Sequence, residues 1–357
     1  MPGRGKAPPG FAFVVSILGA QEDPNRFGVQ SRLVQVPVTI TDAKGRLVDG
    51  LDAEDFVVLD NGKPVDRTAI DTIATGTAPI AIVVAVQSSG ISTAVLAKVR
   101  KIGSMIQPLI TGDRGCAAVV SFASRVRWLT ECTNDASKLT SAFWMIRPGE
   151  EKAGRMLDAV HEGIERLSRR PNSRRVLLLI SESRDRGSES DLETTVKAAQ
   201  MASVTIYSAT YSSFKTAMTA KPSDTAPVYL PTHPEYPRAD AGSPPGREQV
   251  PIQPQAQRVD ILGGLSELNR LSQAQTTQIF AETTGGTTFP FTRQKALEQA
   301  IEKLGTELHS QYVISFAPDP AAAPGYHRLE VRVSRKGDHR IRSRPGYWAG
   351  GSGVQQP

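Results

Sequence analysis

The apolar run "PIAIVVAV" at 79–86 is followed at once by a polar turn, Gln87-Ser88-Ser89-Gly90. A turn of this kind at the end of a buried strand is where open α/β sheets place their binding sites. Hydroxyl groups there can serve as oxygen ligands for a hard cation such as Mg²⁺, or as nucleophiles. The turn itself holds no carboxylate, histidine or lysine, so its chemistry depends on the residues that other segments bring to it.

The rest of the chain contains few of the residue patterns that are typical of enzymes. Ser88 and Ser89 do not lie in a Gly-x-Ser-x-Gly sequence, and no Asp–His pair stands out in the context of a serine hydrolase. Gly285-Gly286 precedes a predicted strand, which favours a helix C-cap over a phosphate loop. None of the histidines has metal-ligand spacing to another histidine or a cysteine: His161, His233, His309, His327 and His339. We therefore expect no enzymatic activity.

Strands and helices alternate over residues 79–210 and would position the turn. Strands are predicted at 80–86, 116–123, 125–130, 175–180 and 204–211, and helices at 92–109, 135–145, 155–167 and 190–201. The runs "AIVVAV" and "RVLLLI" are apolar at consecutive positions, which indicates strands that helices bury on both faces. Such alternation favours right-handed crossovers. The sequence therefore predicts an α/β fold with a doubly wound, mostly parallel sheet, flanked by a small β-rich subdomain.

Segments of different composition flank this region and interrupt it. From Val34 to Ile40, apolar residues alternate with polar residues or proline, and Pro37 favours an edge strand. An insertion holds nine of the 25 prolines, which favours a mobile segment. The predicted divisions are a signal sequence or disordered tail at 1–28, a β-rich unit at 29–76, an α/β domain at 77–310 with the insertion at 212–260, a β extension at 311–349 and a disordered tail at 350–357. We expect the two β segments to pair, because both flank the α/β domain.

Cys116 and Cys132 are the only cysteines, and the two apolar runs around Ser124 predict a β-hairpin between them. If the turn is centred on Ser124, Phe122 lies opposite Val126 and, counted outward, Cys116 lies opposite Cys132. Opposed residues of antiparallel strands are close enough to form a disulfide, which would persist in an oxidising compartment. Two free thiols in a buried hairpin remain the alternative.

Composition and charge narrow the classes of partner. The 357 residues carry a formal net charge of +6, and 39% of them are hydrophobic, as in a globular protein. The basic runs "RLSRRPNSRR" and "SRKGDHRIRSR" lack interleaved aromatic residues, which argues against nucleic-acid binding. No run approaches the roughly 18 apolar residues of a membrane span. Arg4, Lys6 and the short apolar stretch after them predict export to the periplasm or the exterior, with a disordered cytoplasmic tail as the alternative.

Several long stretches carry a family resemblance. They are "VPVTITDAKGRLVDGLDAEDFVVLDNGKPV", "LLLISESRDRGSESDLE", "AETTGGTTFPF", "LHSQYVISFAPDP", "YHRLEVRVSRKG" and "RPGYWA". In their order and content they resemble the von Willebrand factor A (VWFA)-related domain proteins of the acidobacterial type. The resemblance implies a metal-ion-dependent adhesion site at the carboxyl ends of the sheet strands. Its pattern is Asp-x-Ser-x-Ser after the first strand, a threonine in a middle loop and an aspartate after the fourth strand.

This chain departs from that pattern at most positions. The matching residues are Gln87, Ser89, Ile91 with Ser92 beside it, Gly154, and Glu182 with Asp185 three residues on. Replacing the first carboxylate by the amide of Gln87 removes a unit charge a few ångströms from the ion, which is worth several kcal/mol even at an effective dielectric constant of about 20. The resemblance therefore implies a degenerate site that has lost Mg²⁺ and needs no cofactor. A rearranged metal site using Ser89, Ser92, Glu182 and Asp185 is the alternative.

Together these observations predict a non-enzymatic protein-interaction or adhesion module whose partner is another protein. The binding face would comprise Gln87, Ser89, Ile91, Ser92, Gly154, Glu182 and Asp185. A metal-dependent adhesion protein that uses Ser89, Glu182 and Asp185 remains the competing hypothesis.

Overall fold

The computed structural model describes residues 33–66, 70–75, 78–91, 93–149, 153–170, 172–211, 265–319 and 323–349. The predictions for the two tails, for Ser92 and for the insertion at 212–260 lie outside these residues. Across the described residues, every helix is too short or too polar to cross a membrane.

A six-stranded sheet forms the centre of the α/β region. Its strands in chain order are β5 (Ile80–Gln87), β6 (Cys116–Phe122), β7 (Val126–Thr133), β8 (Arg174–Ser181), β9 (Val204–Thr210) and β10 (Thr288–Pro290). They lie in the order β10-β9-β8-β5-β6-β7, and all are parallel to their neighbours except the edge strand β7. Numbered from β5, this is the strand order of doubly wound sheets.

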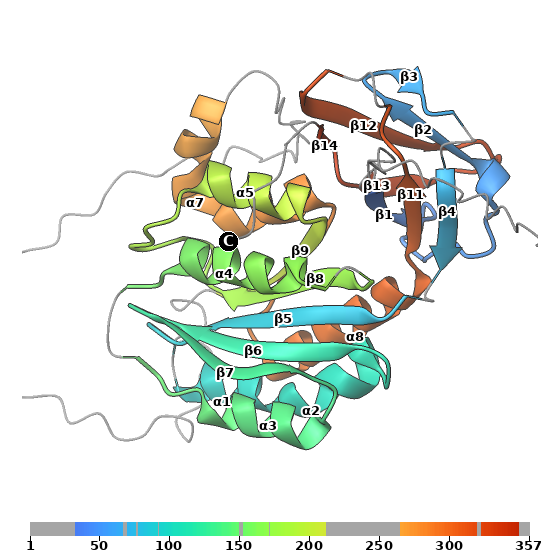
Figure 1. The fold of residues 1–357 in the computed structure, drawn as a ribbon. Helices are drawn as coiled ribbons and strands as arrows, with labels where there is room; N and C mark the ends of the chain where they lie inside the picture. Colours follow the sequence, from blue (N-terminus) through green and yellow to red (C-terminus); the bar gives the residue numbers. More distant parts are fainter. Residues whose placement is uncertain are drawn as a thin grey trace, which may run out of the picture. The chain divides into compact units, whose positions relative to one another are not determined.

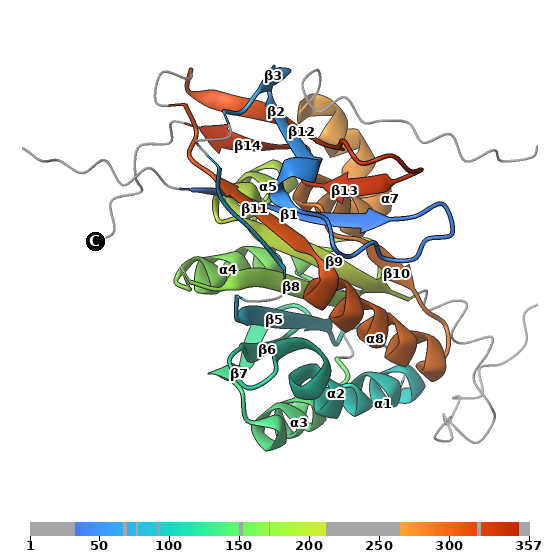
Figure 2. The ribbon, with the colours of Figure 1, turned by 90° about the vertical axis from the view of Figure 1, so that its right-hand side faces the viewer.

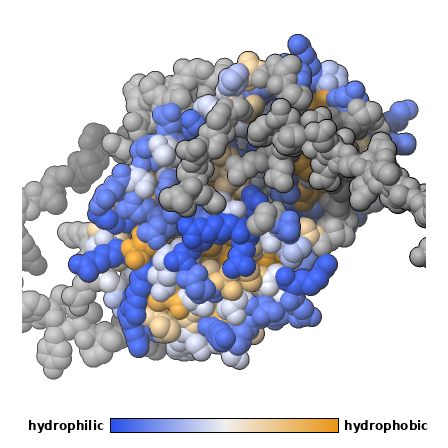
Figure 3. All heavy atoms as spheres, in the orientation of Figure 1, coloured by the Kyte–Doolittle hydropathy of each residue, from blue (hydrophilic) through white to orange (hydrophobic). Residues whose placement is uncertain are grey.

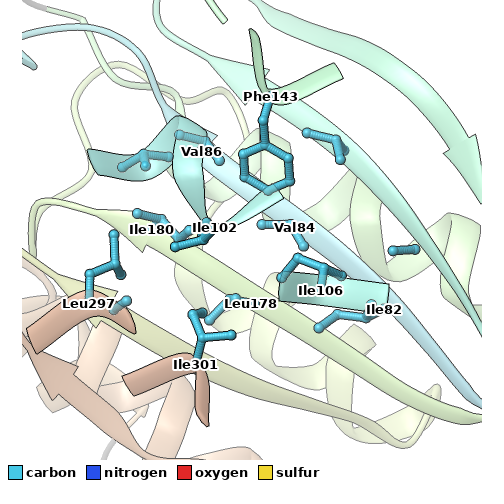
Figure 4. Close-up of a cluster of buried hydrophobic side chains, with 14 of the residues drawn as sticks. Ile82, Val84, Val86, Ile102, Ile106, Phe143, Leu178, Ile180, Leu297 and Ile301 are labelled. Carbon is cyan, nitrogen blue, oxygen red and sulfur yellow. The ribbon is translucent and has the colours of Figure 1, made fainter. Parts of the chain in front are cut away.

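Helices cover both faces of this sheet (Figure 1). One layer holds α1 (Thr93–Lys101), α2 (Gly103–Ile106), α3 (Ala136–Met145) and α8 (Gln294–Ser310), and the other holds α4 (Met156–Ser168), α5 (Leu192–Met201) and α7 (Leu265–Thr284). Within β5, Val84 and Val86 pack into the first layer, where Figure 4 shows them beside Ile102 of the α1–α2 junction. Val83 and its alternate neighbours pack into the second layer, so all of β5 is buried.

The helix predicted at 92–109 is divided in the structure. It becomes α1, α2 and a π-helical turn, η3 (Gln107–Thr111). Gly103 begins α2 beneath Phe143, so closely that a Cβ atom on Gly103 would lie 2.8 Å from Phe143 Cδ2. Pro108, which has no N–H group to donate, lies within η3. A glycine that favours close packing and a proline therefore interrupt a helix that the apolar periodicity alone predicts as continuous.

The β segments at the two ends of the chain pair with each other (Figure 2). One four-stranded sheet has the order β13-β1-β11-β4 and the other the order β14-β12-β2-β3. The bounds are β1 (Val34–Thr41), β2 (Phe56–Asp60), β3 (Lys63–Pro64), β4 (Ile70–Thr75), β11 (Tyr312–Phe316), β12 (Gly325–Val333), β13 (Arg340–Ser343) and β14 (Gly346–Ala349). A short 3₁₀ helix, η1 (Ala53–Asp55), precedes β2. The predicted pairing and the predicted fold class are both confirmed.

The edge position predicted for the strand with Pro37 is wrong. β1 lies between β11 and β13 in its sheet. Pro37 is opposite Val313 of β11, whereas β13 begins to pair only at Val38. At Pro37, β1 therefore pairs with β11 on one side and not with β13 on the other, so the proline lies at a local edge of the ladder.

The β6–β7 hairpin contains the disulfide between Cys116 and Cys132, whose Cα atoms are 5.2 Å apart. Phe122 lies opposite Val126, as the turn at Ser124 predicts. Farther out the register shifts twice, so that Ala117 pairs with Thr133 and the two cysteines are not directly opposite. Such bulges insert extra residues into one strand, which counting outward from the turn does not reveal.

Candidate functional site

The parallel strands of the six-stranded sheet end at one edge, the carboxyl edge. β5 has β6 on one side and β8 on the other, so the strand order reverses between β5 and β8. Doubly wound sheets bind ligands at this switch point. Here the turn after β5 pairs with the segment before α4 through Ser89 and Gly149, and that segment pairs with the loop after β8 through Gly154 and Arg186. We call the following set the carboxyl-edge face: Gln87, Ser88, Ser89, Gly154, Glu182 and Asp185.

Gln87 ends β5 and is only 2% exposed. Its Oε1 atom accepts a hydrogen bond from the backbone N–H of Glu182 at 3.0 Å, and its Nε2 atom donates to the carbonyl oxygen of Ser89 at 3.1 Å. The amide thus joins the end of β5, the turn after it and the loop after β8. Only a side chain with both a donor and an acceptor can make this pair of bonds.

The two serines of the turn differ in their contacts. The Ser88 hydroxyl donates to the carbonyl oxygen of Phe122 at 3.2 Å, which fixes the turn to the end of β6. The Ser89 hydroxyl is buried, with the residue 1% exposed, and finds no hydrogen-bond partner in the part of the chain that the structure describes. Ser89 is therefore the one serine of this pair whose hydroxyl is left for a ligand.

Gly154 and Ile91 occupy two positions where the resemblance expects oxygen ligands. A Cβ atom on Gly154 would lie 3.2 Å from Gln87 Nε2 and 3.4 Å from Ser89 Oγ, so the glycine leaves room for the Gln87 amide. Ile91 is 6% exposed and belongs to the apolar cluster of β5, α1 and α8. It lies under the carboxyl-edge face rather than on it.

Glu182 opens the loop after β8. Its Oε2 atom lies 3.2 Å from Nη2 of Arg186, and its side chain is only 12% exposed. Arg186 in turn exchanges two backbone hydrogen bonds with Gly154, at 2.9 and 3.0 Å. The carboxylate is therefore paired with a guanidinium that the local backbone holds in place.

Asp185 serves the start of α4. Its Oδ1 atom accepts from the backbone N–H of Leu157 at 3.0 Å and from the Ser188 hydroxyl at 2.6 Å, and its Oδ2 atom accepts from Ser188 N at 3.3 Å. A carboxylate at the first turn of a helix satisfies N–H groups that have no partner within the helix. Asp185 thus acts as a cap supplied from another loop.

Tyr211 directly follows β9 beside the loop after β8, and sequence reasoning gave it no role at the site. It is 5% exposed, its ring packs 5.8 Å from that of Phe291, and its hydroxyl lacks a hydrogen-bond partner among the described residues. Burial, together with the negative charge of Glu182, raises the pKa of Tyr211 far above its ordinary value. The hydroxyl therefore stays protonated and remains a donor.

The structure brings most of the predicted residues together at the switch point, but it gives them different tasks. Gln87 bonds to Ser89 and Glu182 and lies against Gly154, Asp185 bonds to α4, Ile91 joins the core, and Ser92 lies outside the described residues. Among the described residues, no group of three or more His, Cys, Asp or Glu side chains is placed to hold a metal ion. Arg186 and Ser188 were missed, although Arg186 follows Glu182 by four residues.

No protein-family model matches this chain, and no curated protein matches it. Among solved structures, it is similar to the conserved hypothetical protein BatB from Bacteroides thetaiotaomicron, at 14% identity over 64% of this chain and 99% of that chain, with a TM-score of 0.40. It is also similar to a von Willebrand factor type A protein from Catenulispora acidiphila, at 10% identity over 88% of this chain and 73% of that chain, with a TM-score of 0.42. The fold class rests on the strand order and direction of the six-stranded sheet.

Proposed function

We propose that this chain is a non-enzymatic, adhesion-type protein-binding module, and that it binds its partner through the carboxyl-edge face without a divalent cation. The observation that carries the proposal is the Gln87 side chain. Both ends of its amide are committed, to Glu182 N and to Ser89 O. It therefore holds two loops together and offers no charge to a cation.

The other possible metal ligands of the carboxyl-edge face support the same conclusion. The Glu182 carboxylate pairs with Arg186, and both oxygens of Asp185 accept hydrogen bonds from α4 or from Ser188. A divalent cation requires several carboxylate, hydroxyl or carbonyl oxygens that converge on one point. The oxygen atoms of this face do not fit such an ion. A rearranged site built from Ser89, Glu182 and Asp185 would have to break these contacts first.

Two further features support a binding protein outside the cytoplasm. Among the described residues, the loops of the carboxyl edge contain no lysine and no histidine, the side chain that most often acts as a general base. The disulfide between Cys116 and Cys132 favours an oxidising compartment, as expected for a periplasmic or extracellular protein.

Calorimetric titration of the full chain with Mg²⁺, Mn²⁺ and Ca²⁺ tests the metal-free part of the proposal. We expect no binding by the natural chain. The matched variant carries Gln87→Asp, Ile91→Ser, Gly154→Thr and Glu182→Asp. The shorter side chain at position 87 makes room for the threonine at position 154. Binding by this variant alone would support an inherited but emptied site, and micromolar binding by the natural chain would overturn the proposal.

Site-specific photocrosslinking in the producing cell tests the protein-binding part. A crosslinking amino acid at Ser124, in the turn at the carboxyl edge, should capture one defined protein. The same group at Asn172, just before β8 at the opposite edge of the sheet, is the control and should capture none. Equal capture from both positions, or capture from Asn172 alone, would contradict binding through the carboxyl-edge face.

A further inference from the structure

The described carboxylates in the loops of the carboxyl edge make contacts within the protein itself. Glu182 pairs with Arg186, Glu189 pairs with Arg155 at 2.9 Å, and Asp185 accepts from Leu157 N. Asp191 accepts from Thr194 N at 2.8 Å, a hydrogen bond that holds the pKa of this carboxyl group below its ordinary value. The negative charge of the loop after β8 is therefore largely neutralised or bound to backbone N–H groups.

Four arginines of the same edge are placed differently. All are exposed, and none makes a side-chain hydrogen bond or ion pair with another described residue: Arg125, Arg147, Arg184 and Arg293. They come from four separate segments, namely the β6–β7 turn, the segment after α3, the loop after β8 and the start of α8. In Figure 3, hydrophilic residues (blue) predominate along the left-hand side, where these loops lie in Figure 1. Among the described residues, these four arginines thus add positive charge without a partner to the loops around the switch point.

Two buried hydroxyl donors lie among these loops. Ser89 Oγ and Tyr211 Oη have no partner among the described residues, although their residues are only 1% and 5% exposed. Buried polar groups in folded proteins nearly always have a hydrogen-bond partner. These two hydroxyls are independent of the arginines, and they favour a ligand that brings hydrogen-bond acceptors to the same edge.

We infer that the partner presents an acidic segment, and that its carboxylates bind directly to the four arginines. This inference rests on the proposed function and specifies the partner's chemistry. Guanidinium groups bind carboxylates through two parallel hydrogen bonds, so they supply both charge and geometry without a bridging metal. Hydroxyl and guanidinium donors then bind the partner, and the Gln87 amide and the carboxylates of the edge stay committed to the fold.

An acidic protein segment fits this edge better than a nucleic acid. Sequence-independent binding of single-stranded nucleic acid uses aromatic side chains as stacking platforms between the basic residues. Two aromatic residues at this edge, Tyr211 and Phe291, are buried against each other at 5% and 3% exposure and are unavailable for stacking. Trp144 precedes Arg147 by three residues and is 56% exposed, with Arg100 5.4 Å from its ring centroid. A single exposed ring does not form a series of stacking platforms.

Fluorescence anisotropy with a labelled oligoglutamate peptide tests the inference on the full chain. The face variant carries Arg125→Gln, Arg147→Gln, Arg184→Gln and Arg293→Gln. The matched variant carries Arg114→Gln, Arg169→Gln, Arg170→Gln and Arg340→Gln, which are exposed positions away from the carboxyl edge with the same change in charge. Measurements are made with a chelator present, in low salt and in about 0.15 M salt, where screening acts over about 8 Å.

We expect the natural chain to bind oligoglutamate and the face variant to bind about tenfold more weakly, since four exposed ion pairs of modest strength together amount to that factor. The matched variant should stay within about twofold of the natural chain. Equal weakening of both variants, or no binding above a neutral Gly-Ser peptide, would overturn the inference. So would tighter binding of an oligonucleotide of equal charge through the same four arginines.

Repeating the experiment with Mg²⁺ in place of the chelator separates failure of the inference from failure of the proposed function. If Mg²⁺ is required for oligoglutamate to bind, both the metal-free function and direct recognition by arginine are wrong. If oligoglutamate does not bind with or without Mg²⁺, while crosslinking from Ser124 still captures a protein, only the acidic character of the partner is wrong.

Discussion

At the scale of single residues, the amide of Gln87 makes two hydrogen bonds that no carboxylate can make together. A Gln87→Glu substitution would place a charged oxygen where Nε2 now donates to the Ser89 carbonyl at 3.1 Å. Because two acceptors would then face each other in a buried position, we expect the free energy of unfolding at neutral pH to fall by about 2–3 kcal/mol. Urea denaturation of the full chain measures this change.

The pH dependence of that loss is its internal control. Burial and the neighbouring carbonyl disfavour the charged form, so the pKa of the introduced carboxyl group should rise above about 4.3 in the folded state. The protonated acid can donate to Ser89, so the variant should regain stability as the pH falls through this raised pKa. A difference from the natural chain that is the same at neutral and acidic pH would contradict the assigned bonds.

His327 gives the natural chain a pH dependence of the same sign, because its pKa is also raised in the folded state. Its Nδ1 atom lies 2.9 Å from Asp60 Oδ1 and its Nε2 atom 2.9 Å from the Ala323 carbonyl, so both ring nitrogens face acceptors, while Tyr347 donates to Asp60 Oδ2 at 2.6 Å. Burial lowers the pKa of His327, but the Ala323 hydrogen bond and the Asp60 carboxylate outweigh it and raise the pKa. The stabilisation is therefore complete below about pH 6.5 and lost as the pH rises through the folded pKa.

We expect His327→Gln to remove this pH dependence. The free energy of unfolding of the natural chain should decline between about pH 6.5 and 8. The variant should be less stable at acidic pH and should show a flatter profile over the same range. Parallel slopes for the two proteins would mean that another group titrates there. His309→Gln, at an exposed position on α8, is the matched histidine control.

The sequence predicted which residues lie at the site more fully than it predicted their contacts. The sequence alone shows that Gln87, Ile91 and Gly154 stand where the resemblance expects metal ligands, because a resemblance assigns a position to each ligand. The hydrogen bond from Glu182 N to Gln87 could not be predicted, because 95 residues separate its partners and only the β5–β8 pairing brings them together. The same holds for Asp185 and Leu157, which are joined only when α4 docks beside the loop.

At the scale of elements, the disulfide ties the edge strand β7 to β6. The two cysteines are 16 residues apart, and closing a loop of this size stabilises the folded chain by about 3 kcal/mol in the chain-entropy description. We expect the double variant Cys116→Ala, Cys132→Ala to lose about this much free energy of unfolding. The natural chain measured with a reductant is the control and should lose a similar amount. No loss in either would show that the disulfide does not constrain the unfolded chain.

Helices and strands could be predicted where a single periodicity of apolar residues determines the structure. The consecutive apolar residues of β5 and β8 identify buried parallel strands, and the alternation in β1 identifies a strand with one buried face. The periodicity fails where a local contact overrides it. Gly103 and Pro108 divide a helix whose apolar residues are still correctly spaced, and the β7 bulges shift a register that the turn sets correctly.

At the scale of the whole molecule, Glu307 of α8 joins the β-rich subdomain to the α/β domain. Its Oε1 atom accepts from Tyr207 of β9 at 2.7 Å and from Thr39 of β1 at 3.2 Å, and it lies 2.5 Å from Arg342 of β13. The carboxylate is only 12% exposed, so removing it leaves donors from three strands without their acceptor. Two subdomains that share such a buried polar group should unfold together.

We therefore expect a single unfolding transition for the natural chain. Trp128 lies in β7 of the α/β domain and Trp348 in β14 of the β-rich subdomain. Variants that retain only one of these tryptophans should give coincident urea transitions. Glu307→Ala should lower the free energy of unfolding by about 3 kcal/mol and make the two transitions diverge, with Trp348 reporting the earlier one. Glu302→Ala, at an exposed position on the same helix, should change neither quantity. Separate transitions in the natural chain would mean that the α/β domain holds the carboxyl-edge face without help from the subdomain.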